Sequence, residues 1–203
     1  MIIKIKNTFI FCLGTFLNAF GIALAAKANI GITPISCFPY VVSIATPLTF
    51  GMTTCIWSVI VVISEVLVVG KEFPKVQYLQ LALAFLLGFF IDVSLYLLKI
   101  FTVETYFLKL IVVLAGGVIM GFGISMQVKK NILLLPIDGL VKAIAGKISR
   151  EFGYIKIILD VVIVILAAFT SFILMGSVEG IREGTVILAI LTGFVIKFFL
   201  KKL

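Results

Sequence analysis

The chain has 203 residues, of which 63% are hydrophobic and 13% are charged, and its mean hydropathy is +1.32. A soluble domain is about 45–50% apolar and about 25% charged, so this composition excludes a soluble globular protein. The net charge of +8 comes from basic residues scattered between apolar runs. That pattern excludes a nucleic-acid-binding surface and is typical of loops beside a membrane.

Long apolar runs predict helices that cross a bilayer, because a span needs roughly 20 mostly apolar residues. Residues 28–64, for example, carry no Asp, Glu, Lys or Arg. In the first half we expect a long span, a short segment and two further spans, over about 8–26, 34–48, 53–69 and 77–98. In the second half we expect the same series over about 106–128, 136–148, 155–175 and 185–200.

The two short segments differ from the spans. Each begins at a proline, Pro34 or Pro136, which suits the first turn of a helix. The second, with 13 residues from Pro136 to Ile148, is too short to cross comfortably, and Pro39 and Pro47 should bend the first one. Both segments are therefore expected to be bent or re-entrant, which a bilayer permits only against protein or beside a cavity.

The chain contains an internal repeat with an offset of 102 residues. Gly14 aligns with Gly116, and 15 of the 50 positions from 14 to 63 are identical to their partners. The matches include Lys, Asn, Pro and Phe-Gly pairs, which a general apolar bias does not align. We therefore expect one transmembrane domain over 1–203, with repeat one over about 8–100 and repeat two over about 106–203.

The distribution of basic residues favours a topology. If both short segments re-enter, six spans remain, and the basic residues divide into 13 on one side and 4 on the other. If all eight segments cross, the division is roughly 11 to 6. The six-span arrangement agrees better with the positive-inside rule. It makes the two repeats inverted, places both termini in the cytoplasm and puts Lys27 and Lys129 on opposite sides; eight spans remain the alternative.

The fold class expected is therefore all-α: a polytopic bundle of two homologous repeats with six spans and two short helices. Enzymatic chemistry is not expected. Histidine is absent, and Cys12, Cys37 and Cys55 are widely spaced within apolar runs. No nucleotide-binding loop or nucleophile motif occurs, so we expect no cofactor, no metal and no catalytic residue.

Charged side chains within spans are costly and demand a reason. Glu65 lies about a turn from a span end, where reaching toward the interface explains it. Asp92 lies deeper and is the candidate for proton or cation coupling. Asp138 is spaced from Lys142, and Lys156 from Asp160, as ion pairs on a helix would be.

A polar binding site is expected at the interface of the repeats. The acidic residues Asp138 and Asp160 align with Ser36 and Ser58, which would give the cavity one acidic wall. The candidate substrate-binding residues are Lys27, Asn29, Ser36, Asp92, Lys129, Asn131, Asp138, Asp160, Arg182 and Glu183. A lattice of ion pairs that stabilises helix packing is the competing interpretation.

Several motifs resemble a known family. Residues 21–36 (GIALAAKANIGITPIS), 88–92 (GFFID), 136–138 (PID) and 182–185 (REGT) are similar to the bacterial YitT/YczE-type membrane proteins. The resemblance covers nearly the whole chain. It implies a largely uncharacterised membrane family, with a proposed small-molecule exporter role for some relatives.

The expected function is transport of a small polar molecule or ion across the bacterial inner membrane. Export is one of the two directions that the sequence leaves open. A membrane-embedded binding subunit that needs an energising partner is one alternative. A non-transporting scaffold or regulator is another. The expected partners are the lipid bilayer and the small solute, with homo-oligomerisation left open.

Overall fold

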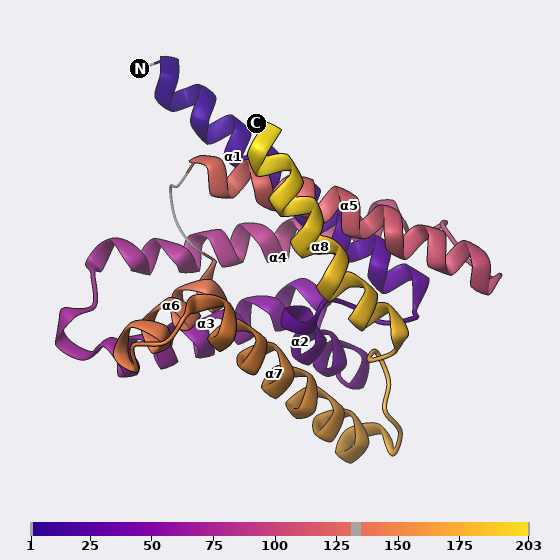
Figure 1. Ribbon diagram of the computed structural model, residues 1–203. Coiled ribbons are helices and arrows are strands. Elements are labelled where there is room, and N and C mark those ends of the chain that lie inside the picture. The colour runs from indigo at the N-terminus through magenta and orange to yellow at the C-terminus, as the bar shows by residue number, and fades with distance from the viewer. Residues whose placement is uncertain (1, 131–134, 203) are drawn as a thin grey trace. The chain divides into compact units, whose positions relative to one another are not determined.

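The computed structural model describes residues 2–130 and 135–202, and every regular element within them is a helix. In chain order the helices are α1 (Ile2–Ala28), α2 (Pro34–Ala45), α3 (Phe50–Val69), η1 (Gly70–Glu72), η2 (Lys75–Tyr78), α4 (Leu79–Leu97), α5 (Tyr106–Lys130), α6 (Pro136–Lys147), α7 (Phe152–Met175) and α8 (Glu183–Lys202). Figure 1 follows them along the chain. The all-helical fold class is confirmed.

Six of the described helices are long and apolar enough to cross a membrane. Their spans are Thr8–Ala28, Phe50–Glu72, Lys75–Leu97, Tyr106–Val128, Phe152–Met175 and Glu183–Lys202. The two short helices, α2 and α6, have 12 residues each. At a rise of about 1.5 Å per residue, such a helix covers about 18 Å of a hydrocarbon core about 30 Å thick.

Local sequence explains where several helices begin and end. Thr49 caps α3, its hydroxyl accepting a hydrogen bond from the backbone N–H of Met52 at 3.1 Å. α3 therefore begins three residues earlier than the apolar pattern predicts. α2 contains Pro39 but ends at Ala45, so Pro47 lies beyond it. α7 ends at Gly176, which adopts a left-handed conformation with φ of 72°.

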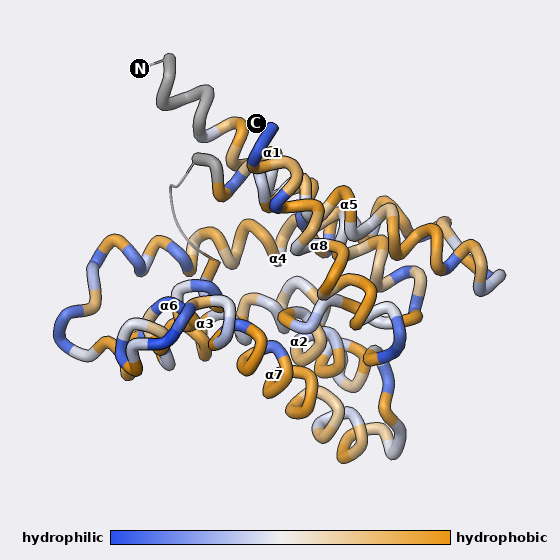
Figure 2. The backbone as a smooth tube through the Cα atoms, in the orientation of Figure 1, coloured by the Kyte–Doolittle hydropathy of each residue, from blue (hydrophilic) through white to orange (hydrophobic). Residues whose placement is uncertain are grey.

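Apolar side chains on the outside of α7 fit contact with lipid. Ile157, Val161, Ile165 and Phe169 recur every four residues, and each is 51–65% exposed. Figure 2 shows α7 coloured as hydrophobic over most of its length. A soluble protein rarely exposes an apolar stripe of this length, so the stripe indicates a lipid-facing surface.

The described chain divides into two compact units, and each combines segments from both sequence halves. Unit 1 contains α1, α5, α8 and the second part of α4. Unit 2 contains α2, α3, α6, α7 and the first part of α4. These units therefore do not coincide with the two halves of the sequence.

Within unit 1, α1 and α5 pack closely through glycines. A Cβ atom built at Gly14 would lie 2.8 Å from the carbonyl oxygen of Gly123, and one built at Gly116 would lie 2.8 Å from that of Gly21. Because the later glycine of α1 meets the earlier glycine of α5, the two helices run antiparallel. Small residues permit such close backbone approach where lipid supplies no hydrophobic drive.

Two further contacts complete unit 1. Gly117 and Gly121 of α5 leave room for Leu191 and Val195 of α8. The segment after α1 contacts the start of α8, where the N–H of Gly184 donates to the carbonyl oxygen of Ile30 at 2.8 Å. This bond satisfies one of the N–H groups that a helix start leaves unpaired.

Within unit 2, each short helix packs against a long one. α2 contacts α7 and α3, while α6 contacts α3 and α7. An apolar cluster joins α3, α6 and α7 through Val61, Ile137, Leu140 and Ile163, and Phe38 of α2 packs against it. This packing places both short helices against protein.

Candidate functional site

A pocket of about 680 Å³ lies in unit 2, between the end of α3 and the short helix α6. This volume lies within the range typical of small-molecule sites. Its lining residues are Glu65, Val68, Val69, Glu72, Pro74, Gln77, Gly139, Lys142, Ala143, Gly146 and Lys147. Two acidic and two basic side chains thus share one mainly aliphatic wall.

Glu65 is the most deeply buried charged group of this wall, at 1% exposure. Its carboxylate lies directly against α6, since a Cβ atom at Gly139 would be 2.8 Å from both carboxylate oxygens. Gln80 of α4, also fully buried, lies beside it. The interpretation of Glu65 as a side chain reaching toward the membrane interface is wrong, because packing against α6 encloses it.

The wall contains acceptor atoms that lack partners. Among the described residues, neither the buried Oε2 of Glu65 nor the buried Oε1 of Gln77 has a hydrogen-bond partner. Lys147, in contrast, donates from Nζ to the carbonyl oxygen of Val68 at 3.3 Å, which ties the end of α6 to the end of α3. The pocket therefore has unpaired acceptors in its wall.

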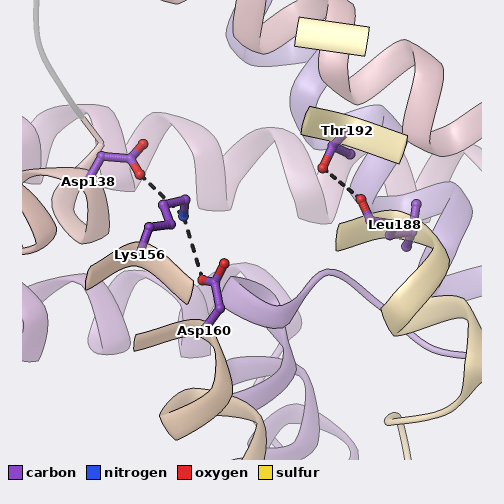
Figure 3. A network of polar contacts seen from close by, with 5 residues as sticks. All are labelled: Asp138, Lys156, Asp160, Leu188 and Thr192. Carbon is purple, nitrogen blue, oxygen red and sulfur yellow. Dashed lines mark hydrogen bonds and ion pairs between the residues drawn. The ribbon is translucent and has the colours of Figure 1, made fainter. Parts of the chain in front are cut away.

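Outside the pocket, Asp138 of α6 and Asp160 of α7 both pair with Lys156 of α7. Lys156 Nζ lies 3.4 Å from Oδ1 of Asp138 and 3.6 Å from Oδ1 of Asp160, and all three side chains are 25–27% exposed. Figure 3 shows Lys156 between the two carboxylates. The spacing argument was right for Lys156 and Asp160. It was wrong for Lys142, because Asp138 pairs with Lys156 across two helices and Lys142 lines the pocket.

Arg182 and Glu183 form an exposed ion pair at the start of α8, with Arg182 Nη2 at 3.3 Å from Glu183 Oε1. An exposed pair of this kind contributes little to stability, because water screens the two charges. The next two residues, Gly184 and Thr185, are buried against the segment after α1. The local geometry therefore fits a helix start anchored by its backbone.

The remaining candidates occupy different places. Lys27 Nζ lies 3.5 Å from the carbonyl oxygen of Lys99 in unit 1. Asn29 follows α1 and has φ of 51°, a left-handed conformation that Asn tolerates better than most residues. The backbone conformation is therefore a structural reason for an asparagine at this position. Asp92 of α4 and Ser36 of α2 are half-buried, and both have interaction partners.

Two candidates are not described. Asn131 and the side chain of Lys129 lie outside the described residues. None of the eight candidates whose side chains the structure describes lines the pocket beside Glu65. Sequence reasoning missed Glu65 as a site residue, although it follows the uncharged run 28–64 inside a span, which was the available signal.

These features define a polytopic α-helical membrane protein with a pocket, lined by both charged and aliphatic residues, beside a short helix. The chain belongs to a family of unknown function, DUF6198, whose model matches residues 5–201. It is 29% identical to "Uncharacterized membrane protein YczE" of Bacillus subtilis (strain 168), over 97% of this chain and 86% of that protein. The expected kinship with YczE-type membrane proteins is thus confirmed. No solved structure matches the chain.

Proposed function

We propose that this protein is a small-molecule carrier of the bacterial inner membrane, built from two inverted repeats. The observation that carries the proposal is the packing of its two short helices. α2, in the first half, contacts α7 of the second half, and α6, in the second half, contacts α3 of the first. Secondary transporters commonly bind substrates where short or broken helices meet at a repeat interface.

The contacts between α1 and α5 support the inverted relation. The sequence repeat aligns Gly14 with Gly116 and Gly21 with Gly123. In the fold, Gly14 meets Gly123 and Gly21 meets Gly116, so each contact has a counterpart with the halves exchanged. Such reciprocity is what a two-fold axis produces. Because the helices are antiparallel, that axis lies across them, which fits repeats of opposite orientation.

The proposed orientation of the chain in the membrane determines the side to which the pocket opens. The division of basic residues into 13 and 4 supports a cytoplasmic location for both termini and for the loop after α3. The pocket beside Glu65, at the end of α3, then opens toward the cytoplasm. A carrier that exports its substrate would load it from this side.

Cysteine labelling tests the orientation. In a background without Cys12, Cys37 and Cys55, single cysteines replace Lys27 or Lys129. We expect a membrane-impermeant maleimide to label Lys27→Cys from outside the cell and Lys129→Cys only after the membrane is opened, because α1 and α5 run in opposite directions. Labelling of both from one face would exclude the inverted arrangement and favour eight spans.

Solute flux tests the function. The purified protein is reconstituted into liposomes loaded with unlabelled amino acids, polyamines or sugar phosphates, and counterflow of the matching radiolabelled solute is measured. We expect exchange of at least one class above that of protein-free liposomes. Absence of exchange for every class would contradict an autonomous carrier. Co-purification of an ATPase would then favour the binding-subunit alternative, and its absence a scaffold.

A further inference from the structure

The wall of the pocket beside Glu65 contains buried hydrogen-bond acceptors that have no donor among the described residues. A carboxylate that is 1% exposed leaves Oε2 without a hydrogen-bond donor, and Oε1 of Gln77 in the same wall is also unpaired. Burying a polar group without a partner costs free energy, and burying an unpaired charge costs more. Gln80, which lies beside Glu65, adds one unpaired acceptor, Oε1, and one unpaired donor, Nε2. Three unpaired acceptors thus face one unpaired donor, so the missing partner is a donor, and a positively charged donor would also balance Glu65.

Gly139 leaves the space that the carboxylate of Glu65 occupies. The carboxylate fits against the backbone of α6 only because residue 139 has no Cβ atom, which would lie 2.8 Å from Oε1 and from Oε2. The pocket thus joins a buried acceptor from α3 to a short helix whose backbone approaches it closely. Preorganisation of this kind reduces the entropy lost when a ligand binds.

The other charged residues indicate what else the ligand carries. With Glu65 and Glu72 balanced by Lys142 and Lys147, the wall is neutral as a whole. Lys147 already donates to the carbonyl oxygen of Val68, whereas Lys142 is exposed at the pocket. A ligand that pairs its cation with Glu65 and its anion with Lys142 keeps the site neutral, which a purely cationic or anionic ligand would not.

We propose that the pocket between α3 and α6 binds a small zwitterion, with a primary ammonium group on Glu65 and Gln77 and an anionic group toward Lys142. The inference rests on the proposed carrier function in one respect, since it names the substrate class of that carrier. The binding site itself stands on the geometry of unit 2.

Binding is measured by titration calorimetry on the full chain in detergent, with glycine, γ-aminobutyrate and ε-aminocaproate as zwitterions. Butylamine and butyrate serve as the half-ligands. We expect at least one zwitterion to bind more tightly than butylamine, and butyrate to bind most weakly. Absence of binding by all three zwitterions, or butyrate binding as tightly as the best of them, would overturn the proposal.

Substitutions of Glu65 and Gly139 test whether the zwitterion binds in this pocket. Glu65→Gln keeps the shape and removes the charge, so we expect at least a tenfold loss of affinity for the best zwitterion with the melting temperature of the free protein unchanged or raised. Gly139→Ala should also weaken binding, because its methyl group displaces the carboxylate. Gly153→Ala is the matched control: Gly153 of α7 lies outside the pocket lining, and a Cβ there meets no atom within 4 Å. We expect its affinity to equal that of the wild type.

The outcomes separate the two proposals. Wild-type affinity in Glu65→Gln, or in Gly139→Ala if the first variant does not fold, would overturn the zwitterion site. Zwitterion binding in detergent without counterflow in liposomes would uphold the site and contradict the carrier. Counterflow of another solute without zwitterion binding would uphold the carrier and contradict the assignment of its substrate.

Discussion

Replacing Gly21 by alanine should greatly weaken the packing of α1 on α5. The added Cβ would lie 2.7 Å from Cβ of Met120 and 2.8 Å from its backbone nitrogen, and it would also meet the carbonyl oxygen of Gly116. Backbone atoms of two packed helices cannot move aside as a flexible side chain can. We expect a loss of about 3 kcal/mol from overpacking, seen as a lower melting temperature in detergent and a lower yield of folded protein.

A second glycine at the contact between α1 and α5 allows a companion prediction. Gly123 of α5 meets α1 in a similar way, since a Cβ there would lie 2.5 Å from the carbonyl oxygen of Gly14. Gly123→Ala should therefore be about as damaging as Gly21→Ala. Gly193 in α8 is the matched control, because a Cβ there meets nothing within 4 Å. Gly193→Ala should change stability by less than about 1 kcal/mol, in either direction. Equal melting temperatures for all three variants would refute the close approach of α1 and α5.

Gly31→Ala is expected to have the second large effect. Gly31 has φ of +118°, a conformation unfavourable for residues with a Cβ atom, and that Cβ would lie 2.6 Å from the backbone nitrogen of Thr185. The strain of about 1–3 kcal/mol adds to the overlap with the start of α8. We expect a total loss of about 3 kcal/mol or more, measured as the melting temperature in detergent.

A second glycine separates strain from overlap. Gly70 has φ of +71°, but a Cβ there meets no atom within 4 Å. Gly70→Ala should therefore cost only the conformational strain, about 1–3 kcal/mol. If Gly31→Ala were no more damaging than Gly70→Ala, the contact between the segment after α1 and the start of α8 would not stabilise unit 1.

Apolar runs and prolines were enough to predict the helices. The six spans and the two short helices occupy the predicted parts of the chain, with differences at their ends such as the start of α3 at Phe50. The reason is local: a segment exposed to hydrocarbon must satisfy its own backbone hydrogen bonds, so an uncharged run of sufficient length becomes a helix. The helical start at Pro136 likewise follows from the fixed φ and missing N–H of proline.

The polar groups could not be placed in the same way. A spacing of four residues identified Lys156 as a partner of Asp160, because both lie on one helix. It could not show that Asp138 reaches the same lysine from α6, nor that Glu65 is enclosed against Gly139. Which side of α3 and of α7 faces α6 depends on the packing of helices far apart in the chain. The apolar runs that form the helices hold almost no information about that choice, because lipid and a neighbouring helix accept the same apolar side chains.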